Sequence, residues 1–112
     1  MTHFVIDKNS VLDRMALESL FSVSPPAWRE PFNSIMVVPT PGEQILFSYS
    51  RPDKKLGIHA PDNYKGTKET ALKDTAIIMQ AIADFGKIPA DFKRSQLKVY
   101  KRNSEKLLSA IS

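Results

Sequence analysis

The sequence predicts a small α+β domain, in which a three-stranded antiparallel meander is covered by an amphipathic helix, with an N-terminal helix before it and a basic C-terminal helix after it. Three observations lead to this fold class. Residues 67–85 have a clear helical periodicity, β-branched and aromatic residues are concentrated in residues 35–58, and basic residues are concentrated in residues 87–106. A chain of 112 residues ordinarily forms one domain, so we expect residues 1–112 to be a single small globular unit.

The N-terminal segment predicts a short strand followed by a helix. Residues 3–6 favour a short edge strand, with Phe4 and Ile6 on one side. Asn9 or Ser10 is a suitable N-cap for a helix that runs to about Phe21. The apolar stripe of that helix would consist of Val11, Met15, Leu17, Leu20 and Phe21.

Residues 22–32 contain three prolines and predict no regular element. We expect an ordered loop that places Trp28 and Phe32 against the core. The next segments, residues 35–38 and 44–49, have strand composition and are separated by the turn sequence Pro39-Thr40-Pro41-Gly42, which predicts a hairpin. A type I turn at residues 51–54 then leads to a third strand around Leu56 and Ile58, which completes the meander.

The helix expected at residues 67–85 is the natural cover for the meander. Thr67 is suited to its N-cap, and Gly86 followed by Pro89 is suited to its C-terminal end. One half of its circumference carries Ala71, Leu72, Thr75, Ala76, Ile78, Met79, Ile82, Ala83 and Phe85, and the polar half carries Glu69, Thr70, Lys73, Asp74, Gln80 and Asp84. Only Ile77 and Ala81 fall on the polar half, so we expect one buried face and one face in water.

The segment after Pro89 has two interpretations. In the first, a helix runs from Pro89 to about Ile111, with an apolar seam of Leu97, Tyr100, Leu107, Leu108 and Ile111. In the second, residues 96–101 form a strand, and a short helix starts at Asn103 or Ser104. We favour the long helix because it places most of the basic residues on one face.

The composition sets limits on function. The net charge is +4, but residues 87–106 contain seven bases and two acids, so the remainder of the chain is close to neutral. There is no cysteine, and hence no disulfide, thiolate nucleophile or cysteine-based zinc site. The sequence has no segment of signal-peptide or membrane-span character, so we expect a cytoplasmic protein with no membrane partner.

No pattern of residues indicates catalysis, a metal or a cofactor. His3 and His59 lack the spacing of metal ligands, and the four glycines are isolated, which argues against a phosphate-binding loop. Asp53, Asp62 and Asp91 are explained by turns and helix caps. We therefore expect a non-enzymatic protein without a metal or cofactor.

Two functional hypotheses follow. In the first, this small basic protein is a nucleic-acid-associated accessory protein that binds DNA or RNA through its basic C-terminal helix, with the contacts made by Arg94, Lys98, Lys101 and Arg102 and by Tyr100 stacking on a base. In the second, it is a protein-binding adaptor or inhibitor, like many small bacterial and phage accessory proteins. Its contacts would then come from Trp28, Arg29 and Tyr64, or from the N-terminal helix pairing in a homodimer.

Overall fold

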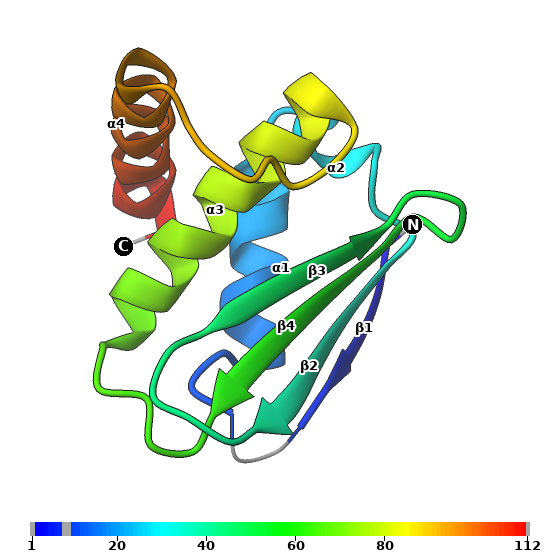
Figure 1. The fold of residues 1–112 in the computed structure, drawn as a ribbon, viewed down its shortest axis with the longest axis vertical. Coiled ribbons are helices and arrows are strands. Elements are labelled where there is room, and N and C mark those ends of the chain that lie inside the picture. The colour runs from blue at the N-terminus through cyan, green and yellow to red at the C-terminus, as the bar shows by residue number, and fades with distance from the viewer. Residues whose placement is uncertain (1, 8–9, 112) are drawn as a thin grey trace.

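The fold, given by a computed structural model that describes residues 2–7 and 10–111, is an α+β arrangement built on one four-stranded sheet. The elements are β1 (His3–Ile6), α1 (Arg14–Val23), α2 (Pro26–Arg29), β2 (Ser34–Thr40), β3 (Leu46–Ser50), β4 (Lys55–Pro61), α3 (Lys68–Phe85) and α4 (Arg94–Ile111). The helices gather on one side of the sheet, and α4 packs on α3 and α1 at the far side of the helical layer (Figure 1). The predicted α+β class is confirmed.

The sheet has the strand order β1-β2-β4-β3, so the predicted three-stranded antiparallel meander is wrong. The pairs β1/β2 and β2/β4 are parallel, and only β3 and β4 pair in antiparallel fashion, through the turn at residues 51–54. The strand segments themselves are where the composition predicts them. The error concerns pairing, because β4 lies between β2 and β3 and no hairpin forms around residues 39–42.

The position of Pro39 explains how β2 can occupy the interior of the sheet. The carbonyl of Val37 accepts a hydrogen bond from the Asp7 N–H, so Val37 faces β1. Pro39 faces the same side but lies beyond the end of the β1 ladder, where no N–H is required. The five residues 41–45 between β2 and β3 can cross one strand position, which is a distance of about 10 Å.

Parallel pairing of β1 and β2 requires a crossover connection, and α1 supplies it. Its N-cap is Asp13, whose carboxylate accepts from the Ala16 N–H at 2.7 Å. The predicted cap at Ser10 is wrong, because the Ser10 hydroxyl accepts instead from the Leu12 N–H. The other predicted cap, Asn9, lies outside the described residues. Met15 is 78% exposed rather than buried, because it lies on the side of α1 opposite the buried Leu17 and Leu20.

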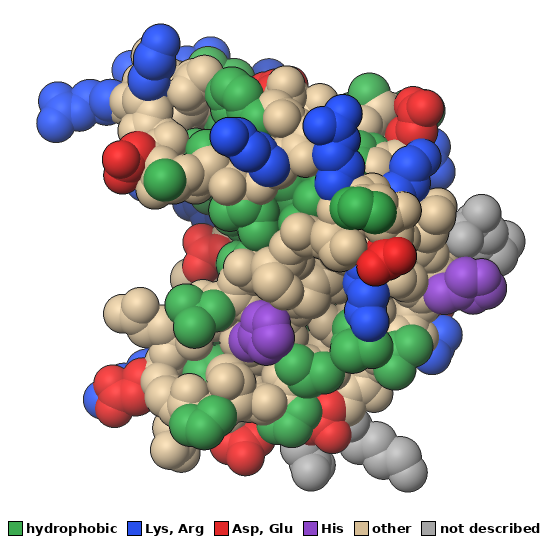
Figure 2. Space-filling view, turned by 45° about the vertical axis from the view of Figure 1, so that its right-hand side comes forward, with side chains coloured by type: hydrophobic (Ala, Val, Ile, Leu, Met, Phe, Trp, Pro, Cys, Tyr) green, Lys and Arg blue, Asp and Glu red, His purple; other side chains and the backbone are tan. Residues whose placement is uncertain are grey.

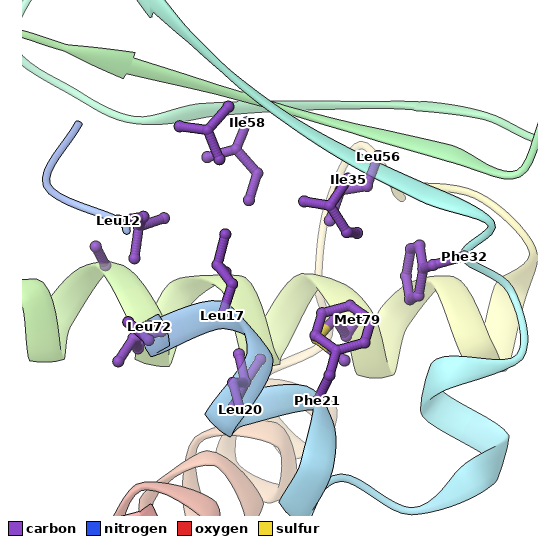
Figure 3. Close-up of a cluster of buried hydrophobic side chains, with 14 of the residues drawn as sticks. Leu12, Leu17, Leu20, Phe21, Phe32, Ile35, Leu56, Ile58, Leu72 and Met79 are labelled. Atoms are coloured by element: carbon purple, nitrogen blue, oxygen red, sulfur yellow. The ribbon is translucent and has the colours of Figure 1, made fainter. Parts of the chain in front are cut away.

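The proline-rich segment is more regular than expected. Within it, α2 forms a single helical turn that starts at Pro26, a position where proline is tolerated because the first turn needs no N–H. Phe32 is buried and Trp28 is half-buried, and both pack on the core as predicted. The core lies between the sheet and the helices, and Figure 3 shows Leu17 and Phe21 of α1 and Met79 of α3 meeting Ile35, Leu56 and Ile58.

The helix α3 has the predicted caps but two buried faces. Thr67 accepts from the Thr70 N–H at 3.1 Å, and Gly86 ends the helix with a φ of 71°. Ile77 and Ala81 are buried against α4, and Gln80, expected in water, is only 2% exposed. Phe85, expected in the core, is 42% exposed. The long-helix interpretation of the C-terminal segment is confirmed, although α4 begins at Arg94 and not at Pro89.

Candidate nucleic-acid interface

The outward face of α4 carries a row of basic side chains. Arg94, Lys98 and Arg102 are exposed and spaced by four residues, and Lys106 continues the same row. At 1.5 Å per residue, the row covers about 18 Å from Arg94 to Lys106. Each member is turned by about 40° from the one before it, so the row winds slowly around the outward side of the helix. We call Arg94, Lys98, Arg102 and Lys106 the α4 basic row.

The charges of the α4 basic row are not compensated. Among residues 2–7 and 10–111, no carboxylate forms an ion pair with any member of the row. Other exposed bases do have such partners; for example, Lys68 Nζ lies 2.8 Å from Asp13 Oδ2. The row therefore retains its positive charge for an external anion.

Lys101 has a different environment from the row. It lies on the flank of α4 close to the carboxylate of Asp74 on α3, although it is exposed. Burial raises the pKa of the Asp74 carboxyl, while the positive charges of Lys73 and Lys101 act to lower it. Lys101 therefore interacts with a carboxylate of the same protein, and its charge is less available to an external anion than the charges of the row.

A buried polar network fixes the rotation of α4. The side-chain amide of Gln80 on α3 donates to the Tyr100 carbonyl at 3.0 Å and to the Ser104 hydroxyl at 3.1 Å. Its oxygen accepts from the Asn103 amide at 2.9 Å. The network and the buried Leu107 hold one side of α4 against α3, so the opposite side, which carries the basic row, must face outward.

Tyr100 is not part of this outward surface. Its side chain is 5% exposed, and its hydroxyl donates to Asp84 Oδ2 at 2.5 Å. Burial, together with the hydrogen bond to Asp84 and the negative charge of that residue, raises the pKa of Tyr100 to about 12. The prediction that Tyr100 stacks on a base is wrong, because its ring packs edge-on against Phe92 within the helical layer.

The residues predicted to bind protein are not brought together. Trp28 and Arg29 lie in α2, next to the C-terminal end of α3, whereas Tyr64 precedes the N-terminal end of the same helix (Figure 1). Trp28 and Tyr64 are both half-buried against the core. Burial raises the pKa of Tyr64, and the charge of Asp74 adds to this effect. Of the three, only Arg29 is fully exposed.

Arg29 contributes to a groove that the sequence did not reveal. The groove has a volume of about 1090 Å³ and runs beside β1, between that strand and the helices α1 and α2. Apolar rings of Phe4, Phe21 and Phe32 line it, and its charged residues are Arg14, Glu18, Arg29 and Glu30. No local pattern could predict it, because the groove depends on β1 being the outer strand of a parallel pair.

The two histidines lie in different hollows: His3 lines the groove beside β1, and His59 is on the open face of the sheet. His59 Nε2 lies 3.2 Å from the Ser48 hydroxyl, in a shallow hollow of about 300 Å³. The described part of the chain contains no group of three or more histidine and acidic side chains that could hold a metal ion. It also contains no helix with the length and apolar character of a membrane span.

The charges are distributed unevenly over the face of the molecule that Figure 2 shows. In Figure 2, Lys and Arg side chains gather in the upper half of the molecule, where the α3–α4 connection lies, and hydrophobic side chains are more frequent in the lower half, over the sheet.

No known protein family, curated protein or solved structure matches this chain. The function is therefore inferred from the charges and side chains of the α4 basic row and of the groove beside β1.

Proposed function

We propose that this protein is a nucleic-acid-associated accessory protein that binds the phosphate backbone through α4. The observation that supports this proposal is the α4 basic row, whose exposed charges have no ion-pair partner among the described residues. Clustered Lys and Arg side chains bind phosphates and release condensed counterions, which supplies affinity without sequence recognition. Arg94, Lys98 and Arg102 are the principal contacts, and Lys101 contributes from the flank.

The chemistry of the row favours contacts to the backbone over contacts to bases. Ser95 and Ser109 are exposed on the same side of α4 and can donate to phosphate oxygens. Tyr100 is buried, so it offers no ring for stacking. Because DNA and RNA share their phosphates, both fit this surface equally well.

The test is fluorescence anisotropy with labelled duplex DNA and labelled single-stranded RNA, measured from low salt to about 150 mM. If Arg94, Lys98, Lys101 and Arg102 each neutralise one phosphate, log K should fall against log salt concentration with a slope of about −3.6 on duplex DNA. Reversing three charges, with Arg94→Glu, Lys98→Glu and Arg102→Glu, should lower the affinity by about a hundredfold or more at the highest salt.

The matched control reverses three exposed bases that lie outside α4 and form no ion pair with a described residue, with Arg29→Glu, Arg51→Glu and Lys54→Glu. Both variants change the net charge equally, so general attraction to a polyanion falls equally in both. Specific use of α4 requires a much larger loss in the first variant while its melting temperature is unchanged. Equal losses in the two variants, or no wild-type binding near 150 mM salt, would contradict the proposal.

The groove beside β1 favours a second candidate function, protein binding as an adaptor or inhibitor. Arg29 lies there with apolar rings from β1, α1 and the α2–β2 connection, a combination that is common at protein interfaces. Trp28 and Tyr64 do not line this groove, so this candidate rests on Arg29 and on the groove itself.

A further inference from the structure

The strand β1 is an edge of the sheet, and no other strand of the described residues lies on its outer side. The His3 N–H donates to the Asn33 carbonyl and the Asp7 N–H donates to the Val37 carbonyl, so alternate residues of the strand face β2. The main-chain groups of Phe4 and Ile6 therefore face away from the sheet. The Phe4 carbonyl confirms this direction, because it accepts from the Arg14 guanidinium at 2.8 Å.

We propose that β1 pairs in antiparallel fashion with β1 of a second copy of this chain, which joins the two sheets across a twofold axis. This inference deepens the protein-binding candidate by naming its partner, and it does not depend on nucleic-acid binding. In the pairing, Phe4 of one copy lies opposite Ile6 of the other and exchanges main-chain hydrogen bonds with it. Val5 then lies opposite its own counterpart on the twofold axis.

The side chains of β1 favour this register. Val5 is on the open face of the sheet and is 57% exposed, so it is one of the large apolar side chains left in water. Opposite residues of a non-hydrogen-bonded antiparallel pair have Cα atoms about 4.5 Å apart, which brings their side chains into contact. Pairing of the two Val5 residues therefore covers an apolar surface that a single copy exposes.

The charged side chains beside β1 suit a twofold interface, because each copy carries both a base and an acid there. Arg14 and Glu18 follow each other by one turn on the outward side of α1, with 3.8 Å between Arg14 Nη1 and Glu18 Oε1. A twofold axis places two α1 helices antiparallel, so that Arg14 of one copy faces Glu18 of the other. When the partner strand satisfies the Phe4 carbonyl, the guanidinium of Arg14 is released for that ion pair. Arg29 and Glu30 give the rest of the groove a balance of opposite charges as well.

The proposed dimer leaves the basic helix free. The strand β1 and the helix α4 lie on opposite sides of the molecule (Figure 1). Each dimer would therefore present two α4 basic rows, and a ligand long enough to reach both would be held by two linked contacts.

The first test uses the absence of cysteine from the chain. The variant Val5→Cys places one thiol on the twofold axis, at a Cα separation of about 4.5 Å that suits a disulfide. Mild oxidation should convert most of this variant to a covalent dimer of twice 12.6 kDa. The control is Leu46→Cys, on the outer strand at the other edge and 59% exposed, which should remain mostly monomeric.

The second test is sedimentation equilibrium over about a hundredfold range of protein concentration. The wild type should show a monomer–dimer equilibrium, Glu18→Arg should weaken it about tenfold, and adding Arg14→Glu should restore it to within about threefold. Melting temperatures check that each variant is folded. A monomeric wild type, equal cross-linking of both cysteine variants, or no rescue by the charge exchange would overturn the proposal. If the wild type is monomeric but an extended peptide of another protein binds beside β1, the second-copy inference is wrong and the protein-binding candidate stands.

Discussion

The hydroxyl of Tyr100 donates to Asp84 Oδ2 at 2.5 Å, which ties the middle of α4 to the C-terminal end of α3. The ring that makes this contact is 5% exposed. Together with the Gln80 network, it fixes which side of α4 faces outward. The orientation of the basic row is therefore a consequence of polar contacts on the opposite side of the same helix.

The Tyr100 contact predicts a loss of stability at alkaline pH. The pKa of Tyr100 is raised from 10.0 to about 12, mainly by burial and also by Asp84, so folding favours the protonated phenol. Its contribution to stability is complete below pH 10 and is lost as the pH rises toward 12. Tyr100→Phe should cost about 1–3 kcal/mol of unfolding free energy near pH 8 and should remove this part of the alkaline loss.

Urea denaturation at several pH values from 8 upward measures this effect. Tyr49 also donates its hydroxyl within the protein, to the Pro31 carbonyl at 2.7 Å, and burial raises its pKa. Tyr49→Phe is therefore the comparison variant, and it should remove a smaller part of the alkaline loss than Tyr100→Phe, because the pKa of Tyr100 is raised further. An alkaline profile of Tyr100→Phe that is parallel to the wild-type profile would show that Tyr100 does not titrate as described.

Replacing the buried amide of Gln80 should lower the free energy of unfolding, even when the volume of the side chain is kept. Gln80→Met keeps a similar volume but leaves the Ser104 hydroxyl and the Tyr100 carbonyl with fewer partners inside the protein. We expect a loss of about 1–2 kcal/mol, because the hydrogen bonds that Gln80 makes across the α3–α4 contact are lost, while the Ser104 hydroxyl keeps its bond to the Tyr100 carbonyl. The exposed Gln44→Met is the control and should change stability by no more than about 0.5 kcal/mol. Equal stability of Gln80→Met and the wild type would mean that the network makes no net contribution to the free energy of unfolding.

The Gln80 network also shows where sequence reasoning succeeds and where it fails. Thr67 and Gly86 were predicted as the ends of α3 because capping depends on residues adjacent in the chain. The burial of Gln80 was missed because a helical wheel assumes one buried face, whereas α3 packs on the core on one side and on α4 on the other. For the same reason Ile77 and Ala81 looked like exceptions on a polar face.

The strand order of the sheet was missed for a similar reason, because it depends on contacts between residues that are far apart in the sequence. The turn composition of residues 39–42 indicates that the chain changes direction, but not which strand lies beside β2. The groove beside β1 follows from that pairing, and so it was also missed. The basic residues of α4 were predicted correctly as one exposed face because their spacing alone determines it. Tyr100 was misplaced because an amphipathic aromatic residue at the edge of such a face can point either way.

Removing the charge of Asp74 should give a variant that binds nucleic acid more tightly than the wild type. Its pKa is raised chiefly by burial, so the charged carboxylate is disfavoured in the fold and stability falls as the pH rises through this pKa. Asp74→Asn should therefore be more stable than the wild type at neutral pH, and the difference should vanish in acid. The change also frees Lys101, and affinity for duplex DNA should rise about two- to fivefold. Unchanged affinity with raised stability would place Lys101 outside the interface.

Arg102 offers the sharpest test of the number of phosphate contacts. It lies in the middle of the α4 basic row, is exposed, and forms no ion pair with any residue in the described part of the chain. Arg102→Gln should lower the salt slope on duplex DNA by about 1 and should weaken binding to the same degree on unrelated sequences, because a phosphate contact carries no sequence information. Arg29→Gln removes the same charge on α2 and should leave the slope unchanged. If the two variants have the same effect, attraction depends on net charge alone. If Arg102→Gln weakens binding to one sequence much more than to others, the arginine reads a base, and α4 enters a groove instead of following the backbone.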